Sequence, residues 1–434
     1  MIGYKKYKLT PSLGFEKIPA EWDLKKVKYL FHIGRGRVIS QEELMDNGLY
    51  PVFSSQTQNN GCLGYINTFD FDCDQLTWTT DGANAGTVFI RSGKHNCTNV
   101  CGTLQPIKDQ TNLKFSHYAL QYATQFHKRP DTNGAKIMNN EMAEISFALP
   151  AECEQFKIIE YLDYETAKID TLIANQEKLI ELLKEKRQGV ISHAVTKGLN
   201  PNVPMKDSGV EWLGQVPEHW IVKRLKHISP KIGVGLVINP STYTREDGVY
   251  FIFGGDVKEY GFDLKKTRHI SKKDSDNLLP SRLNHRDLVS VRVGYPGITA
   301  VVTEELDGAN CASIIVIRRG SYNSDWLCAA MNIWVGRQQV DLASYGAAQK
   351  QFNVADAIEF IFPVPPLNEQ NEIASFVDNT RNNFDNLSQK AQLQIELLKE
   401  RRIALISAAV TGKIDVRNWQ NPNNNNEAKM EFSA

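Results

Sequence analysis

The sequence predicts an α+β protein in which two globular α/β domains are separated by two long antiparallel helices that pair as a coiled coil. The first observation is a repeat: residues 180–196 (IELLKEKRQGVISHAVT) and 395–411 (IELLKERRIALISAAVT) are identical at 12 of 17 positions, at an offset of 215. The second is that the match continues upstream without a gap, so that each copy spans about 50 residues. The third is that the segments between the copies differ. Together these observations predict an internal repeat about a pseudo-twofold axis.

Each copy has the pattern of a long helix. Apolar residues recur every seven positions, which indicates a heptad seam. They are Leu162, Ile169, Leu183 and Val190 in the first copy, interrupted at Gln176 and flanked by Leu172 and Leu179, and Val377, Phe384, Ala391, Leu398 and Leu405 in the second. Each copy starts after proline with acidic residues in its first turn and ends at a glycine, Gly198 or Gly412. Because a helix with one apolar stripe needs a partner, we expect the two helices to pair.

The globular segments repeat as well. Residues 18–30 (IPAEWDLKKVKYL) match residues 216–228 (VPEHWIVKRLKHI), and β-branched and aromatic runs that indicate strands follow in both. The sequence therefore predicts a first globular domain at 1–147, a central helical spacer at 148–200, a second globular domain at 201–362, a C-terminal helical spacer at 363–415 and a disordered tail at 416–434. Antiparallel helices would place one globular domain at each end.

Composition and cysteine spacing narrow the class of protein. Among 434 residues, Lys plus Arg and Asp plus Glu both number 50, so net charge does not point to a nucleic acid or a membrane. No apolar run approaches the roughly 18 residues of a membrane helix, and no signal peptide is present, so we expect a cytoplasmic protein without a membrane partner. The seven cysteines form no CxxC pair, which predicts free thiols. His95, Cys97 and Cys101 lie close in sequence, but without a second ligand cluster we expect no metal site.

Motifs for enzymatic chemistry are missing from the sequence. No GxxxxGK[ST] phosphate loop, HExxH, GxSxG or dinucleotide-binding fingerprint occurs. The Asn-Pro-Pro-aromatic tetrapeptide of amino-methyltransferases is also missing, since Asn200-Pro201 and Asn239-Pro240 are followed by Asn202 and Ser241. We therefore expect a non-catalytic protein that binds no cofactor of its own.

Four stretches carry a resemblance to a known family. They are FPVPPLNEQNEI (362–373) leading into IELLKERRIALISAAVTGKID (395–415), TTDGANAGTVFIRSGKHNCTNVCGTL (79–104), DLVSVRVGYPGITAVV (287–302) and YGAAQKQFNV (345–354). With the order of two variable domains and two near-identical helices, the chain resembles the specificity subunit of type I restriction-modification systems, over nearly its whole length.

The resemblance implies a set of partners. Each globular domain would be a target recognition domain that recognises one half of a split site in double-stranded DNA. The helices would fix the spacing and dock two modification (methyltransferase) subunits, through which restriction and translocase subunits join. The family also implies S-adenosylmethionine in the methyltransferase and ATP with magnesium in the restriction subunit, and no cofactor in this chain.

Candidate DNA contacts follow from residue chemistry, since Arg or Lys pairs with guanine, Asn or Gln with adenine, and cations with phosphates. The candidates in the first domain are the polar loop Gln56, Thr57, Gln58, Asn59 and Asn60, with Arg35, Arg37, Lys94, Lys128 and Arg129. Those in the second are Lys265, Lys266, Arg268, His269, Arg292, Tyr295, Gln349 and Lys350. The alternatives are a solvated polar loop in the first domain and, around Arg292 and Tyr295, a tight turn shaped by glycines.

Other repeated residues have two interpretations. Gly34-Arg-Gly36 recurs as Gly233-Val-Gly235, which favours a structural turn over a phosphate cradle. The aromatic pairs Trp22 with Trp220 and Tyr50 with Tyr250 are typical of core packing.

The charge count leaves alternatives to the DNA-binding hypothesis. Residues 32–144 hold nine Lys and Arg against eleven Asp and Glu, and residues 231–359 hold fifteen of each. Because phosphate neutralisation supplies most non-specific affinity, we expect the isolated chain to bind DNA weakly and its partners to supply much of the phosphate contact. A coiled-coil scaffold that binds proteins and not DNA is the main alternative. A fused restriction-methylation enzyme would need a methyltransferase domain for which the chain has neither room nor motif.

Overall fold

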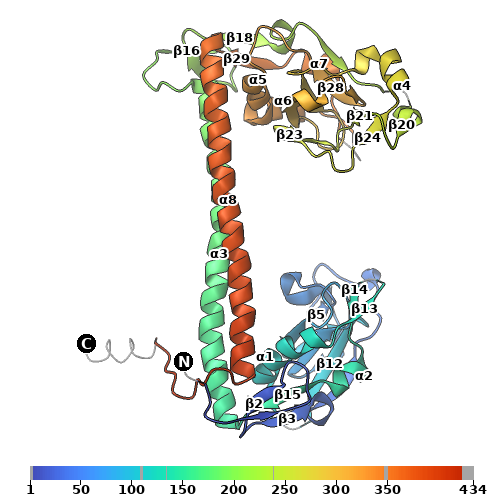
Figure 1. The fold of residues 1–434 in the computed structure, drawn as a ribbon, viewed down its shortest axis with the longest axis vertical. Coiled ribbons are helices and arrows are strands. Elements are labelled where there is room, and N and C mark those ends of the chain that lie inside the picture. The colour runs from blue at the N-terminus through green and yellow to red at the C-terminus, as the bar shows by residue number, and fades with distance from the viewer. Residues whose placement is uncertain (1–2, 108–110, 133, 238, 347–349, 423–434) are drawn as a thin grey trace. The chain divides into compact units, whose positions relative to one another are not determined.

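The computed structural model describes residues 3–107, 111–132, 134–237, 239–346 and 350–422. The chain divides into two compact units: unit 1 consists of residues 1–177 and 393–434, and unit 2 of residues 178–392. Each unit holds one globular region and part of each long helix, α3 (Glu152–Lys197) and α8 (Leu367–Val410) (Figure 1). Segments far apart in the sequence thus build each unit.

Both long helices begin and end at the expected local signals. α3 starts shortly after Pro150, and Gly198 directly follows its last residue with a φ of +79°. α8 starts directly after Pro366, and Gly412 lies just past its end with a φ of +69°. Glycine adopts a positive φ at little cost, so the chain can turn away from the helix at these positions.

In unit 1 the helix segments run antiparallel. Leu162, near the start of α3, lies in the same hydrophobic core as Val410, the last residue of α8. Further along α3, Asp170 forms an ion pair with Arg402, which precedes Val410 in α8. The residue numbers therefore rise in opposite directions along the two segments.

Unit 2 repeats this arrangement. Val195, near the end of α3, shares a core with Ile373, near the start of α8. Arg187, which precedes Val195, forms an ion pair of 2.7 Å with Asp385, which follows Ile373. The predicted antiparallel pairing of long helices is confirmed inside each unit.

The globular part of unit 1 contains two four-stranded sheets and three smaller ones. The larger sheets are β10 (Val88–Arg91), β8 (Gln75–Thr79), β12 (Cys101–Pro106) and β4 (Phe31–Arg35), in that order, and β6 (Cys62–Ile66), β5 (Tyr50–Phe53), β11 (Lys94–Cys97) and β7 (Phe71–Asp72). The smaller ones are β13 (Arg129–Asp131), β14 (Gly134–Lys136) and β9 (Asp81–Gly82); β15 (Ser146–Leu149) with β3 (Asp23–Lys26); and β1 (Tyr7–Leu9) with β2 (Lys17–Pro19). Helices α1 (Leu113–Ala123) and α2 (Asn139–Glu144) complete the region.

Unit 2 repeats the antiparallel four-stranded sheet of unit 1 and differs in the fourth strand of its other large sheet and in its smaller sheets. Its larger sheets are β19 (Ile232–Val234), β28 (Ile314–Ile317), β25 (Leu288–Val291) and β26 (Thr299–Val301), and β20 (Thr244–Arg245), β24 (Arg268–Ile270), β21 (Val249–Ile252) and β27 (Asn310–Cys311). The paired strands are β18 (Ile221–Arg224) with β29 (Ile361–Val364), β16 (Met205–Asp207) with β17 (Gln215–Pro217), and β22 (Val257–Lys258) with β23 (Gly261–Phe262). The helices are α4 (Lys272–Asn277), α5 (Ser324–Asn332), α6 (Trp334–Ala343) and α7 (Val354–Ala357). In both units, one larger sheet is antiparallel and the other contains a parallel pair, β5 with β11 or β21 with β27.

A tryptophan fastens the start of each long helix to the globular region of its unit. Trp22 Nε1 donates to Glu154 Oε2 over 3.0 Å, and Trp220 Nε1 donates to Glu369 Oε2 over 2.9 Å. Both tryptophans are fully buried, as predicted for core residues. A buried indole N–H needs an acceptor, so each glutamate fixes the first turn of its helix against the domain.

The second glycine of each repeated Gly-x-Gly is structural. A Cβ at Gly36 would overlap the carbonyl of Cys97, and a Cβ at Gly235 would lie 2.5 Å from the Cys311 carbonyl oxygen. The Gly36 amide also donates to the carbonyl of Cys101 over 3.0 Å. Because the backbone amide is already bonded, the phosphate-cradle interpretation is wrong and the structural one holds.

The predicted disordered tail starts too early. Val416 is fully buried, and Trp419 packs edge-on against Tyr161 with ring centroids 5.4 Å apart. These two apolar side chains complete the core beside the end of α8. The prediction placed them in the tail because the residues that follow them are polar. Residues 423–434 of the predicted tail lie outside the described residues.

Candidate nucleic-acid interface

The polar loop of unit 1 has an unusual backbone. Asn59 and Asn60 have φ of 49° and 53°, and Gly61 follows with a φ of 78°. Three successive residues in the left-handed region are uncommon, and strain of this kind is concentrated at functional sites. Thr57 to Asn60 are all exposed, so their amide and hydroxyl groups are available to a ligand.

Interactions with the rest of unit 1 hold this loop in place. The Gln56 side chain donates to the carbonyl of Cys62, so Gln56 has an internal role and is only partly accessible. The Asn84 side chain donates to the carbonyl of Ser55 over 3.4 Å, and Arg91 donates to the carbonyl of Asn60 over 2.8 Å. The loop is therefore a preformed surface.

Two of the predicted cations in unit 1 are already neutralised. Arg37 forms ion pairs with Glu43 at 2.8 Å and with Asp70 at 3.2 Å. Its hydrogen bond to Glu43 is the main reason that its pKa is raised. Arg129 forms an ion pair of 2.6 Å with Glu141. Contact with a phosphate would have to compete with these carboxylates.

The remaining three predicted cations differ in accessibility. Arg35 is exposed and donates to the carbonyl of Asn99. Lys94 is exposed, with its ammonium 4.5 Å from the ring centre of Phe69 and 5.9 Å from that of Tyr50, which is half-buried where core packing was predicted. Lys128 is half-buried, and burial lowers its pKa. Arg35 and Lys94 are thus the better placed for phosphate contact.

In unit 2 the structure brings two predicted segments together. The Gly294 amide donates to the carbonyl of Lys350 over 3.1 Å, and the Phe352 amide donates to the carbonyl of Arg292 over 3.2 Å. Arg292, Tyr295 and Lys350 therefore lie at one edge of the domain, although nearly 60 residues separate the segments in sequence. Gln349 lies outside the described residues.

This edge presents an aromatic ring and positive charges. Tyr295 is 81% exposed, far more than packing would explain, and it sits in a tight turn in which Gly294 and Gly297 have φ of +92° and +88°. The turn interpretation and the DNA-contact interpretation are therefore compatible, because the glycines shape the turn that displays the ring. Arg292 is half-buried, and its Nε is buried without a partner among the described residues. Lys350 is exposed.

The other predicted residues of unit 2 form a separate group. Lys265 and Lys266 are exposed. The guanidinium of Arg268 lies 4.7 Å from the ring centre of Phe253. His269 stacks on Tyr250 at 5.1 Å, and Tyr250 is half-buried where core packing was predicted. Among the described residues, no hydrogen bond or ion pair joins this group to the edge around Tyr295.

Comparing the two units identifies residues that sequence reasoning missed. The turn at residues 79–87 of unit 1 corresponds to the turn at 291–298 of unit 2, with Gly82 (φ +87°) in the place of Gly294 (φ +92°). Gly82 pairs with β14 of the neighbouring hairpin, as Gly294 bonds to Lys350. Asn84, exposed in the first of these turns, joins the candidate surface. Residues 79–104 resemble a family motif, and this resemblance is the sequence signal that could have identified Asn84 as a candidate.

Both units contain a cluster of two cations that share one carboxylate. Lys26 and Lys28 both bind Glu144, at 2.7 and 2.5 Å, and their hydrogen bonds lower the pKa of Glu144 to about 2. The equivalent group in unit 2 is Arg224, Lys226 and Glu359. These four cations already have carboxylate partners and are not counted among the candidate DNA contacts.

The histidine and cysteines near the polar loop are structural. His95 is fully buried, and its ring nitrogens contact the Gln75 side chain and the Gly93 carbonyl, each at 2.8 Å. Burial raises the pKa of Cys101 to about 11 and also raises the pKa of Cys97, which keeps both thiols protonated at neutral pH. Within the described ranges, no group of three or more His, Cys, Asp or Glu side chains is arranged to hold a metal ion. Nor does any helix there have the length and apolar character to cross a membrane.

Comparisons with known proteins agree with this architecture. Residues 19–182 match the family model of the type I restriction modification DNA specificity domain. A Mycoplasma pneumoniae chain named as a type I specificity subunit is 31% identical over 382 residues, covering 86% of this chain and 93% of its own length. The specificity subunit of the type I restriction enzyme EcoBI of Escherichia coli is 23% identical over 333 residues, covering 73% of this chain and 68% of its own.

The fold has a counterpart among solved structures. One chain, from a study of complex assembly and conformational transition in a type I restriction-modification system, superposes with a TM-score of 0.68. The superposition covers 92% of this chain and 99% of that chain. At 13% sequence identity, this likeness concerns the fold alone.

Proposed function

We propose the function from one premise: the chain belongs to the family of DNA specificity subunits of type I restriction-modification systems. It would select a two-part site in double-stranded DNA, with one recognition domain for each half-site. The first recognition domain would comprise residues 1–147 and the second residues 201–362, with helical spacers at 148–200 and 363–415. We place this function in the cytoplasm, where the chromosome is.

The observation that carries the proposal is one sheet plan displaying two different surfaces. The antiparallel four-stranded sheet has the same strand order in both units, yet unit 1 exposes a polar loop of amides and hydroxyls, whereas unit 2 exposes Tyr295 beside Arg292 and Lys350. Amide side chains suit the edges of adenine, and arginine and lysine suit guanine and phosphates. A duplicated frame with unlike surfaces fits the recognition of two unlike half-sites.

Catalysis would belong to the partners. The chain lacks the sequence motifs of methyl transfer and nucleotide hydrolysis. S-adenosylmethionine would be bound by the methyltransferase subunits, and ATP with magnesium by the restriction subunit. This chain would select the DNA site at which both activities take place.

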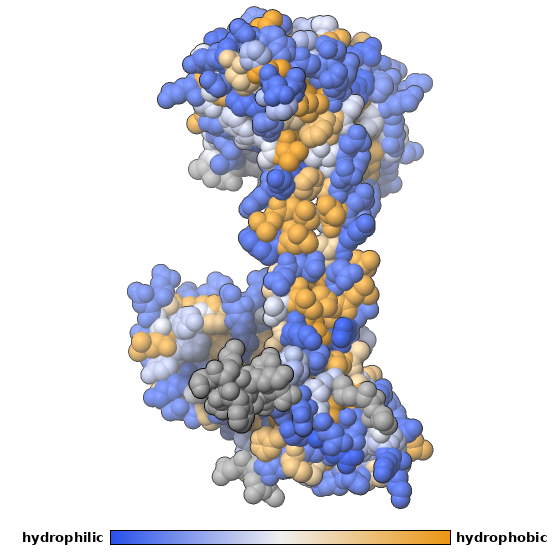
Figure 2. Space-filling model, turned by 90° about the vertical axis from the view of Figure 1, so that its left-hand side faces the viewer, coloured by the Kyte–Doolittle hydropathy of each residue, from blue (hydrophilic) through white to orange (hydrophobic). Residues whose placement is uncertain are grey.

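Exposed leucines on the helices favour two equivalent sites for methyltransferase subunits. In unit 1, Leu172 and Leu397 are 45% and 48% exposed, and in unit 2 Leu387 and Leu182 are 49% and 49% exposed. Leu172 and Leu387 occupy equivalent positions of the repeat, at the offset of 215, and so do Leu182 and Leu397. Figure 2 shows apolar surface gathered over the long helices. Exposed apolar patches of this kind mark protein interfaces, and their repetition indicates two copies of one partner.

Substitution of these leucines is expected to change the stoichiometry of the complex. Leu182→Glu and Leu397→Glu should each remove one methyltransferase subunit, and the double variant should remove both. Loss of a buried leucine together with burial of a charge should weaken each site by about 100-fold or more. Native mass spectrometry of the purified complexes would count the subunits. Gln392→Glu is the control, because it introduces the same negative charge at an exposed position of α8, and this variant should retain both methyltransferase subunits. Loss of binding by this control would contradict a leucine-centred interface.

Methylome sequencing tests the function directly. A host that expresses this chain with its methyltransferase should carry methylated sites of one split motif, with two defined half-sites and a constant gap. An unsplit motif would contradict recognition by two domains. Complete lack of sequence-specific methylation, with a stable complex still formed, would favour the protein-binding scaffold.

A further inference from the structure

Arg91 is a buried cation without a carboxylate partner. It ends strand β10, is 2% exposed, and forms no ion pair within the described part of the chain. Its guanidinium lies 3.6 Å from the ring centre of Phe53 and 4.4 Å from that of Phe89. Burial lowers its pKa to about 10, so the group remains charged at neutral pH. Buried charges are normally paired, and an exception in a folded domain requires an explanation.

The polar contacts of Arg91 lead to the polar loop. Its Nε donates to Thr77 Oγ1 over 3.2 Å, and its Nη1 donates to the carbonyl of Asn60 over 2.8 Å. Its Nη2 is buried without a partner among the described residues. A Cβ on Gly61 would lie 2.9 Å from this Nη2. The side chain therefore supports the left-handed backbone of the loop from beneath.

The fold does not require an arginine at this position. Arg91 pairs with Gln75 in the neighbouring strand, and the amide of Val302 donates to the carbonyl of Asp287 at the equivalent place in unit 2. Val302 is fully buried and apolar. Since the same sheet forms in unit 2 with valine, the arginine serves something particular to the first recognition domain.

We propose that Arg91 is a positioning residue for DNA recognition by the first recognition domain. Through the Asn60 carbonyl it fixes the backbone that presents Asn59 and Asn60, and it places an unneutralised positive charge beneath a surface that meets DNA. The guanidinium does not itself contact a base. This inference rests on the proposed function and adds a residue beneath the surface to the exposed side chains that would contact the bases of the first half-site.

The test uses the assembled methyltransferase complex and the split motif found for the wild-type chain. Arg91→Lys retains a positive charge but replaces the planar guanidinium, whose separate nitrogens bond Thr77 and Asn60, with a single ammonium. Base discrimination at the first half-site should fall at least about tenfold, the equivalent of one good base contact, while discrimination at the second half-site stays unchanged. Gly61→Ala, whose added Cβ would press on Arg91 Nη2 and strain a left-handed residue, should give the same selective loss. The second half-site is thus an internal control in every experiment.

Two controls separate positioning from general damage. Gly209→Ala, at another glycine of positive φ (+74°) with nothing within 4 Å of the added Cβ, should leave both half-sites unchanged. Thermal unfolding shows whether Arg91→Lys leaves the domain folded. Folded Arg91→Lys and Gly61→Ala variants with wild-type preference at the first half-site would overturn the inference. A wild-type complex without a split motif would instead overturn the proposed function.

Discussion

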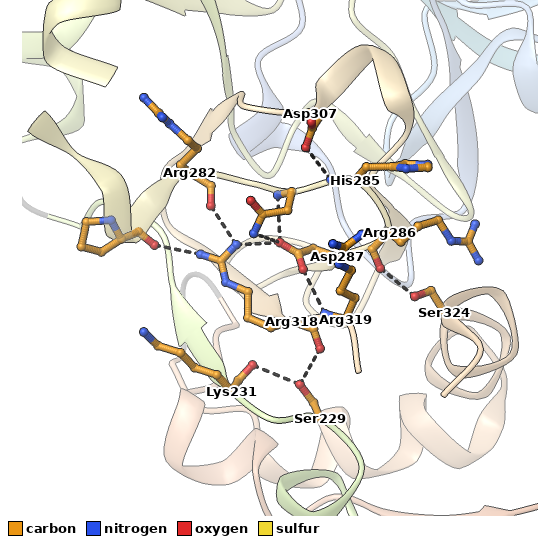
Figure 3. A network of polar contacts seen from close by, with 12 residues as sticks. Ser229, Lys231, Arg282, His285, Arg286, Asp287, Asp307, Arg318, Arg319 and Ser324 are labelled. Carbon is orange, nitrogen blue, oxygen red and sulfur yellow. Dashed lines mark hydrogen bonds and ion pairs between the residues drawn. The ribbon is translucent and has the colours of Figure 1, made fainter. Parts of the chain in front are cut away.

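Asp287→Ala is expected to lower the free energy of unfolding of the second recognition domain by about 3–5 kcal/mol, because it leaves a largely buried arginine unpaired. Asp287 is fully buried and accepts from Arg318 Nη1 over 2.6 Å (Figure 3). The backbone amides of Asn284 and Arg319 also donate to its carboxylate, each over 2.9 Å. The Asn284 side chain donates as well, over 3.3 Å, so the substitution would leave four donors without their acceptor.

Urea unfolding of the full chain, followed by tryptophan fluorescence, would measure the loss, with each unit allowed its own transition. Asp276→Ala is the matched control, since Asp276 forms an exposed ion pair with Arg282 and should cost less than about 1 kcal/mol. The double variant Asp287→Ala with Arg318→Met should recover part of the loss, because it removes the unpaired charge. A loss of under about 1 kcal/mol for Asp287→Ala alone would show that water or a neighbouring group replaces the carboxylate.

The helical frame could be predicted because its determinants are local. The heptad seam, the prolines before each helix and the glycines after it all lie within the helix or beside it, and the structure places Gly198 and Gly412 in the expected left-handed conformation. The antiparallel pairing followed from the repeat and is present in each unit. Periodicity and capping depend on neighbours in sequence, so sequence alone was sufficient.

The candidate surfaces were less predictable because burial and pairing depend on distant residues. Gln56 turns inward to Cys62, and Arg37 is paired with Glu43 and Asp70, which composition could not show. Sequence reasoning did not select Arg91, because its proposed role depends on its hydrogen bond to the Asn60 carbonyl, which only the folded structure shows. Tyr295 was selected as a DNA contact because its turn resembles a family motif, and the structure leaves its side chain 81% exposed.

Lengthening both long helices by one heptad is expected to widen the gap between the half-sites without changing either half-site. Seven residues between Glu177 and Lys178 in α3, and seven between Gln392 and Leu393 in α8, keep the apolar seam in register. They add about 10 Å of helix, equivalent to at most about three base pairs of duplex. Because each base pair also rotates the duplex by about a tenth of a turn, we expect weaker methylation at the widened site.

Methylome sequencing of the variant would measure the gap and both half-sites at once. The same seven residues inserted after Pro201, in the exposed loop that follows α3, should leave the gap at its wild-type value, because that loop does not belong to the helical frame. Insertion into α3 alone should abolish recognition, since one helix would lose register with the other and expose its apolar seam. An unchanged gap after insertion into both helices would show that something other than the helices sets the spacing. Altered half-sites would show that the recognition domains depend on the helices for their own structure.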